Sequence, residues 1–354
     1  MQLTRPFGHD ATLGRLWNAA RSARLPHALL FEGRSGIGKF MAARWFALGC
    51  LCARGPGEPC LTCGPCRRVL SGGERGNHAD LFLVDPLAEG EERIRIGRIA
   101  FRERTEGESE EQSLEEFLSL RPLEGKLRLA LVREAQRMTE QAQNALLKTL
   151  EEPRPGTLLV LETSAAQNLL ATIRSRCIRV RFTSLTPERC VEALLAAGIE
   201  AEAAKALARL AGGSPGKALA MAQNGAREIC ARLAAVARGE RDPLEAAAEL
   251  WELEGDFPGK TPGAKERERA RVVLELAQGL LSDAWRASAG VPVERLAQGE
   301  SAAALAARAS ERELRSRGES LLAARADIER NLAPEAVLQR VLLVLAEGVV
   351  PAAS

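Results

Sequence analysis

The stretch His27-Ala-Leu-Leu-Phe-Glu-Gly-Arg-Ser-Gly-Ile-Gly-Lys39 decides the fold, because it joins an apolar run directly to a glycine-rich loop. The residues that follow, Phe40 to Leu51, are typical of a helix. A strand, a glycine loop and a helix in this order favour a loop that binds phosphate through backbone N–H groups at the helix N-terminus. A lysine at the end of the loop adds a positive charge for the phosphates. The candidate phosphate-binding residues are Gly33, Gly36, Gly38 and Lys39.

Two positions depart from the pattern of an active ATPase. The motif GxxxxGK[ST] supplies a hydroxyl for Mg²⁺ after the lysine, and this chain has Phe40 there. A later apolar run, Leu127 to Val132, ends in Arg133, where an ATPase carries an aspartate for the metal. Glu134 follows it, and a lone glutamate beside an arginine is more often half of a surface ion pair than a catalytic base. We therefore expect weak, metal-independent ATP binding at most and no autonomous ATPase activity.

Further apolar runs predict a sheet. In addition to the apolar runs at 27–31 and 127–132, the runs at 81–85, 157–161 and 178–182 have the length and composition of strands. Strands that alternate with helices predict a parallel sheet flanked by helices, that is, an α/β core. Thr139 is the predicted N-cap of one of these helices, which is expected to stop at Pro153.

The strand pattern stops after residue 183, and helical periodicity continues to the end of the sequence. A break near Pro215 divides this helical part. We therefore expect an α/β core over residues 1–183, a small helical domain over 184–224 and a larger all-α domain over 225–354.

Composition and charge exclude several classes of protein. The chain has 354 residues, with 49 Lys and Arg against 47 Asp and Glu, and a net charge of +2 does not create an overall field that attracts nucleic acid. The N-terminus lacks the apolar core of a signal peptide, and the run 337–350 is interrupted by charges, so we expect a cytoplasmic protein that makes no membrane contact. The segment Thr105 to Glu116 contains six glutamates and no basic residue, and is expected to be a solvated loop or insertion.

The cysteines are clustered as in a metal site. Five of the eight lie between Cys50 and Cys66, and Cys60-Leu-Thr-Cys63-Gly-Pro-Cys66 contains two overlapping CxxC spacings. A fourth thiolate, from Cys52 or Cys50, would complete a tetrahedral zinc site without an open position, which is typical of structural zinc. The alternatives are a cluster of reduced thiols without metal and a redox pair.

These features together resemble the δ′ family of bacterial DNA polymerase III clamp-loader subunits, which is related to the γ/τ ATPases of the AAA+ superfamily. The resemblance covers nearly the whole chain. It rests on the glycine loop and on the strings Leu25-Pro-His-Ala-Leu-Leu-Phe31, Asn144-Ala-Leu-Leu-Lys-Thr-Leu-Glu-Glu-Pro153 and Ala171-Thr-Ile-Arg-Ser-Arg-Cys177, together with the cysteines.

The resemblance implies an AAA+ core with an inserted zinc module at about 50–67, followed by an all-α lid and an all-α collar. It implies that Zn²⁺ is held by Cys52, Cys60, Cys63 and Cys66. It also implies that Arg176, in a short segment expected to be a loop, reaches ATP bound by a neighbouring subunit and so acts in trans. The implied partners are the γ/τ and δ subunits, with the sliding clamp and primed DNA contacted through the complex.

Three departures from the ATPase members separate the functional hypotheses. Phe40, Arg133 and Gly216 stand where an active γ/τ-type subunit would have a hydroxyl, an aspartate and a sensor arginine. Because the first two remove contacts to Mg²⁺, they favour a non-hydrolysing subunit over the alternative, a catalytically active γ/τ-type ATPase. A free-standing zinc module that binds nucleic acid is disfavoured, because basic residues near the cysteines are few.

Overall fold

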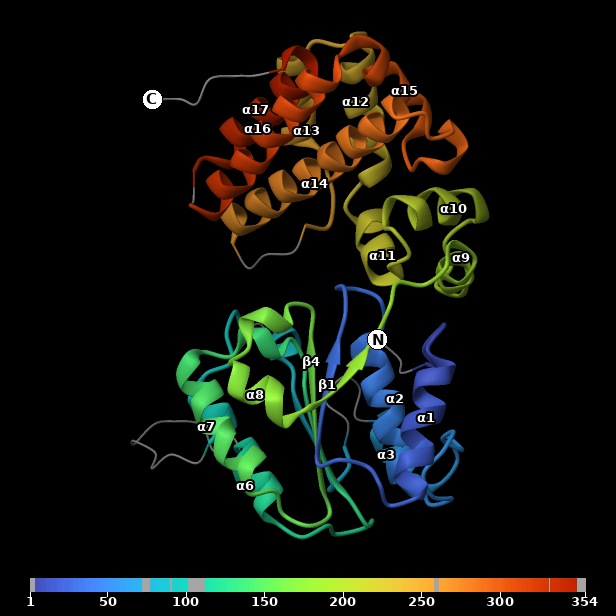
Figure 1. Cartoon of the computed structure of the whole chain (residues 1–354), viewed down its shortest axis with the longest axis vertical. Helices are drawn as coiled ribbons and strands as arrows, with labels where there is room; N and C mark the ends of the chain where they lie inside the picture. Colours follow the sequence, from blue (N-terminus) through green and yellow to red (C-terminus); the bar gives the residue numbers. More distant parts are fainter. Residues whose placement is uncertain are drawn as a thin grey trace. The chain divides into compact units, whose positions relative to one another are not determined.

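The computed structural model describes residues 4–71, 77–89, 91–100, 112–257, 261–330 and 332–348. The chain forms two compact units, Met1–Arg189 and Cys190–Ser354. The first unit combines a sheet with helices, and the second is helical in its described part (Figure 1).

The first unit is built on a parallel sheet. Its strands lie in the order β2-β3-β4-β1-β5, and every neighbouring pair is parallel. The strands are β1 (Ala28–Glu32), β2 (Leu81–Val84), β3 (Arg128–Val132), β4 (Thr157–Thr163) and β5 (Ile178–Arg181). All residues of β1 and β3 are buried, whereas the edge strand β5 is mostly exposed. The strands predicted from apolar runs are confirmed, with small shifts at their ends.

Helices cover both faces of this sheet (Figure 1). They are α1 (Asp10–Arg21), α2 (Lys39–Leu51), α3 (Gly64–Ser71), α4 (Pro86–Glu89), α5 (Ile96–Ile99), α6 (Leu114–Ser119), α7 (Glu140–Glu151) and α8 (Ala171–Arg176). Alternate residues of a strand point to opposite faces. Leu29 and Phe31 therefore pack with α1, α2 and α3, whereas Ala28 and Leu30 pack with α5, α6, α7 and α8. The parallel sheet flanked by helices is the arrangement expected from the sequence.

Side-chain caps fix where two of these helices begin. The hydroxyl of Thr139 accepts a hydrogen bond from the backbone N–H of Ala142, as predicted for the start of α7. Ser113 and Glu116 form a reciprocal capping box at the start of α6. The prediction of a loop over the whole acidic segment is therefore wrong for its last residues, because Leu114 is buried and anchors a helix there. The earlier part of that segment, residues 105–111, lies outside the described residues.

The second unit consists of helices in its described part. They are α9 (Pro187–Ala196), α10 (Ala201–Leu210), α11 (Pro215–Gln223), α12 (Ala226–Arg238), α13 (Pro243–Glu252), α14 (Pro262–Ser288), α15 (Gly299–Arg308), α16 (Glu311–Glu329) and α17 (Pro334–Glu347). The long helix α14 packs against α12, α15, α16 and α17, while α10 packs against α11. Among the residues described, none of the helices combines the length and the apolar character needed to cross a bilayer. The predicted division of this part into a lid and a collar stays a prediction.

One glycine of the phosphate loop is required by a close backbone approach. A Cβ atom on Gly33 would lie 2.3 Å from the carbonyl oxygen of Phe182, which follows β5. The backbone N–H of Phe182 donates to the carbonyl of Glu32 at 2.8 Å, so the two segments are held together at this point. A side chain at position 33 would therefore push the end of β5 away from β1.

Replacing Gly33 by alanine should lower the free energy of unfolding by about 2–3 kcal/mol, because the added methyl group overlaps a hydrogen-bonded backbone. The matched control is Gly14→Ala within α1, where an added Cβ meets nothing within 4 Å. That control should be neutral or stabilising by up to about 1 kcal/mol, because alanine favours helix more than glycine does. Urea unfolding of the full chain measures both. Equal stability of the two variants would contradict this account of Gly33.

Candidate functional site

The lysine of the phosphate loop is buried in an ion pair. Nζ of Lys39 lies 2.9 Å from Oε1 of Glu162, and the two side chains are 2% and 5% exposed. The same ammonium group donates to the carbonyl oxygen of Arg34 at 2.8 Å. The charge that the loop would offer to a phosphate is therefore already neutralised from within the protein.

Glu162 connects three parts of the fold. It lies in β4, where it is in register with Phe31 of β1. Its second carboxylate oxygen, Oε2, accepts a hydrogen bond of 3.0 Å from the backbone N–H of Glu134. Glu134 lies two positions after the end of β3 and has a left-handed backbone, with φ of 51°. A single carboxylate thus links the phosphate loop, β4 and the end of β3.

The two residues that replace magnesium ligands contact each other. The guanidinium group of Arg133 lies 4.8 Å from the centre of the Phe40 ring, in a cation–π contact. The same guanidinium lies 3.0 Å from Oδ2 of Asp85, a buried carboxylate at the end of β2. Arg133 is therefore held by an aromatic ring on one element and by an acid on another.

Glu134 belongs to a polar network and is not the surface residue that the sequence suggested. Its side chain is 16% exposed, and its carboxylate accepts a hydrogen bond of 2.6 Å from the amide of Gln136. Gln136 in turn accepts a hydrogen bond from the hydroxyl of Thr163. Burial, and then the nearby negative charge of Glu162, raise the pKa of the Glu134 carboxyl above its usual value. Its ion pair with Arg137 is long, at 3.7 Å, and offsets this in part.

These residues do not fit a magnesium-bound nucleotide. Lys39 is engaged by a carboxylate, Phe40 has no ligand atom, and Arg133 contributes a cation where the motif expects a metal-binding acid. Positive and negative charges are already paired, as Lys39 with Glu162 and as Arg133 with Asp85. The glycine loop keeps the shape of a phosphate loop, but the charges around it are already paired without phosphate.

Arg176 is the last residue of the short helix α8, and the expectation of a loop at this position is wrong. Its guanidinium group lies 2.6 Å from Oε1 of Glu151 on α7 and also donates to the carbonyl of Thr172. The side chains of Arg176 and Glu151 are 35% and 49% exposed. An ion pair this exposed contributes little to stability, so Arg176 can exchange its partner at small cost.

The four cysteines expected to hold a metal lie together. The sulfur atoms of Cys52, Cys60, Cys63 and Cys66 all lie within 4.8 Å of one another. The Sγ atoms of Cys52 and Cys63 are 3.9 Å apart, close to the separation of about 3.8 Å between thiolates of a tetrahedral zinc site. Cys52 follows the end of α2, and Cys66 lies in the first turn of α3. The donor set and its spacing fit one sulfur-ligated metal ion.

The surroundings of the thiols differ within this group. The hydroxyl of Thr62 and backbone N–H groups donate to the sulfur of Cys60 and lower its pKa to about 5, which favours the thiolate that a metal requires. Burial raises the pKa of Cys66, and a bound cation would oppose this rise. Cys50 lies outside the group, and burial raises its pKa to about 12.

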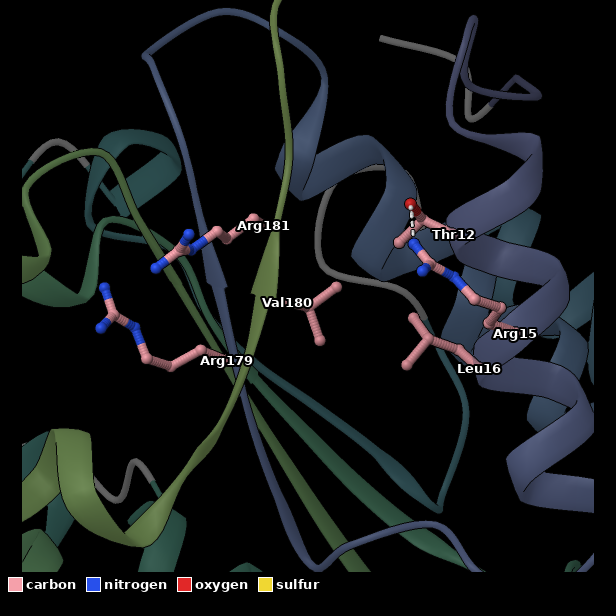
Figure 2. A pocket seen from close by; sticks show the side chains of 6 residues that line it. All are labelled: Thr12, Arg15, Leu16, Arg179, Val180 and Arg181. Carbon is pink, nitrogen blue, oxygen red and sulfur yellow. Dashed lines mark hydrogen bonds between the residues drawn. The ribbon is translucent and has the colours of Figure 1, made fainter.

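A surface hollow between α1 and β5 is lined by arginines (Figure 2). Arg179 and Arg181 point to one side of β5, and Val180 points to the other side, toward Leu16 of α1. Both arginines bind the carboxylate of Glu32, at 2.6 and 3.2 Å. Because Arg179 and Arg181 already have a counterion in Glu32, we assign this hollow no ligand.

The family follows from the sequence of the first unit. Residues 8–186 match the family model described as DNA polymerase III, delta subunit.

The chain belongs to this family.

The curated relatives of this chain include both δ′ and tau/gamma subunits of DNA polymerase III. The chain is 37% identical over 195 residues to the δ′ subunit of DNA polymerase III from Bacillus subtilis, covering 55% of this chain and 54% of the relative. It is 34% identical over 220 residues to the δ′ subunit from Escherichia coli, covering 60% and 61%. It is 32% identical over 179 residues to the tau/gamma subunit from Haemophilus influenzae, covering 50% and 23%. The chain thus spans less than two thirds of the length of these curated relatives.

A solved structure supports the fold class of this delta-subunit family member. A gamma-subunit-related protein of DNA polymerase III from Thermotoga maritima has a TM-score of 0.50 and 19% identity, and the match covers 95% of this chain and 99% of that chain. At this identity the likeness concerns the fold alone. The parallel α/β fold followed by helices, expected from the sequence, is confirmed.

The sequence of this delta-subunit family member predicts the loop and the grouped cysteines, but not the acids that pair with Lys39 and Arg133. The unpredicted residues are Glu162 and Asp85, which hold Lys39 and Arg133. One signal was present, because an acidic residue directly after the apolar run Leu158-Leu-Val-Leu161 is buried if the strand continues, and a buried acid needs a cationic partner.

Replacing Glu134 by glutamine should raise the free energy of unfolding at pH 7. A carboxyl whose pKa is raised in the folded state stabilises the fold while protonated, and this contribution is lost as the pH rises through the folded pKa. The amide avoids the cost of a buried charge and can still accept the hydrogen bond from Gln136.

The gain from Glu134→Gln should shrink as the pH falls toward about 4.3, the usual pKa of a glutamate in an unfolded chain. Urea unfolding between pH 7 and pH 4 measures it, with the exposed Glu91→Gln as the control that should change little at either end. A loss of stability at pH 7, or a gain that does not depend on pH, would refute the assigned environment of Glu134.

Proposed function

We propose that this chain is a non-hydrolysing, δ′-type subunit of a bacterial DNA polymerase III clamp loader. In this role it joins γ/τ and δ subunits in a hetero-oligomer in the cytoplasm. The assembly uses ATP bound by its other subunits to load the sliding clamp onto primed DNA. Membership of the delta-subunit family and the δ′ names of two of its relatives support this proposal.

The observation that carries the proposal is the balanced charge around the phosphate loop. In an active ATPase the lysine is available to the phosphates, and a hydroxyl and an aspartate are available to Mg²⁺. Here Lys39 is paired with Glu162, and Phe40 packs against Arg133. These contacts disfavour the alternative function, a catalytically active γ/τ-type ATPase, although Glu134 is retained.

Arg176 is the residue that we propose acts in trans. A guanidinium group remains charged at any working pH and presents planar, paired donors to phosphate oxygens, which suits it to stabilise charge on a transferred phosphoryl group. In this chain the group is about one-third exposed, and its partner Glu151 lies at the surface. Arg176 is therefore available to ATP on a neighbouring subunit, at the small cost of leaving Glu151.

Arg176→Ala should lower the DNA-stimulated ATPase of a loader reconstituted from this chain, γ/τ, δ and the clamp. A trans arginine supplies on the order of 10³-fold or more at its own site. The loss in the whole loader should be partial, because other ATP sites keep their own arginines. Arg176→Lys should recover little, because lysine lacks the planar pair of donors.

Glu151→Ala is the matched control, because it breaks the same ion pair while keeping Arg176. If Arg176 acts on ATP, this variant should retain the rate of the unmodified loader. Two outcomes would contradict the role in trans: an unchanged ATPase rate in the Arg176→Ala loader, or equal losses of ATPase rate in Arg176→Ala and Glu151→Ala. In either case the role of Arg176 would be limited to its ion pair with Glu151.

We also propose that the four grouped cysteines hold a structural Zn²⁺. Sulfur donors select zinc over harder cations, and four protein ligands leave no position for a substrate. The module joins the end of α2 to α3, so the metal would fix this connection between the two helices. A role in folding, without part in ATP chemistry, is consistent with this placement.

Purified chain should contain one zinc atom per molecule. Cys52→Ser should empty the site, whereas Cys50→Ser should leave the metal content unchanged, because Cys50 lies outside the group of four. Metal analysis by mass spectrometry of the purified variants measures this. Loss of zinc from Cys50→Ser with retention in Cys52→Ser would reverse the choice of ligand.

We propose that two helical domains follow the α/β core, a lid over residues 184–224 and a collar over 225–354. The packing of α14 with α12, α15, α16 and α17, and of α10 with α11, supports this division. In the proposed role, the collar carries the subunit contacts of the loader.

A further inference from the structure

We propose that Glu162 is an internal replacement for a nucleotide phosphate, and that its carboxylate closes the phosphate loop of this chain to nucleoside triphosphates. This goes beyond the proposed role in the clamp loader, which requires only that the chain does not hydrolyse ATP. The two can fail separately, because a chain that binds ATP without hydrolysing it could still serve in the loader.

Glu162 already neutralises the ammonium group of Lys39, which is the group that would bind a phosphate. Its Oε1 lies 2.9 Å from Nζ of Lys39, within a region where both side chains are almost fully buried. A triphosphate in the loop would have to attract Lys39 away from this carboxylate. It would then lie beside an unpaired negative charge, which repels the phosphates.

The second step is that Glu162 cannot easily turn away. Its other oxygen is held by the backbone N–H of Glu134, and β4 lies inside the sheet between β3 and β1. The neighbouring Glu134 is itself a carboxyl, so a movement of Glu162 toward it would bring two acids together. Glu162 is therefore held within the sheet, and its buried ion pair with Lys39 of α2 is not a flexible surface contact.

The third step is that the loop keeps its shape without a ligand. Gly36 and Gly38 have left-handed φ angles of 75° and 91°, as a turn into the helix requires. The buried ring of His9 lies with Nε2 2.7 Å from the carbonyl oxygen of Ile37, and Lys39 bonds the carbonyl of Arg34. Internal contacts therefore order the loop as a bound phosphate does in a nucleotide site. Since the loop is already shaped for a phosphate, the nucleotide is excluded by the charge of Glu162 and not by a disordered loop.

The test is the affinity for ATP in the presence of EDTA, measured by isothermal titration calorimetry on the full chain. Magnesium is left out because Phe40 and Arg133 are not expected to hold it. The unmodified chain should bind weakly or not at all. Glu162→Gln removes the charge and keeps the size of the side chain, and should bind ATP about tenfold or more tightly, because Lys39 is then free for the phosphates. Adding Lys39→Met to this variant should abolish the gain.

Glu32→Gln is the matched control. Glu32 ends the neighbouring strand β1 and is also buried, but it pairs with Arg179 and Arg181 instead of the lysine. It should give no gain in ATP affinity. If Glu162→Gln does not fold, Glu162→Asp replaces it, since the shorter carboxylate cannot keep both of its bonds, and a smaller gain is expected.

Three results would overturn the inference. The first is tight ATP binding by the unmodified chain that is lost in Lys39→Met. The second is a folded Glu162 variant that gains no affinity. The third is an equal gain in Glu32→Gln, which would indicate a general effect of charge.

Discussion

The buried ion pair between Lys39 and Glu162 is the interaction on which the rest of the first unit depends. Two charges removed from water are tolerable only when they remain paired and their other hydrogen-bonding atoms are satisfied. Here the ammonium group also bonds the carbonyl of Arg34, and the carboxylate also bonds the N–H of Glu134. The pair therefore fixes the glycine loop against β4 and against the end of β3, and it does so without a ligand.

This constraint is consistent with a chain that has the glycine loop of a nucleotide-binding fold and, as we propose, does not use it for ATP hydrolysis. The loop and the sheet that a phosphate would organise are organised by acids of the chain itself, and Arg133 is neutralised by Asp85 in the same way. The groups for which we propose a function lie away from the loop. Arg176 offers a partly exposed guanidinium at the end of α8, and the four cysteines form a sulfur-lined group between α2 and α3.

Much of the fold and of the candidate site could be predicted from local sequence, and there is a physical reason why the acidic partners and the helix α8 could not. Apolar runs and the glycine loop are local signals, so the strands, the loop and the grouping of the cysteines were found. Glu162 and Asp85 were missed because their partners lie 123 positions back and 48 positions ahead in the sequence, and only the register of a parallel sheet brings them together. Arg176 was expected in a loop because six residues carry too little periodicity to show the helix α8.

The central claim is that Lys39 and Glu162 stabilise the fold as a pair. A double-mutant cycle on the full chain tests it most directly, with Lys39→Met, Glu162→Leu and the combination compared by urea unfolding. Each single change leaves one buried charge without its partner and should cost about 3–5 kcal/mol. The double variant leaves no charge behind, and should be more stable than either single variant. Losses that simply add in the double variant would contradict the claim.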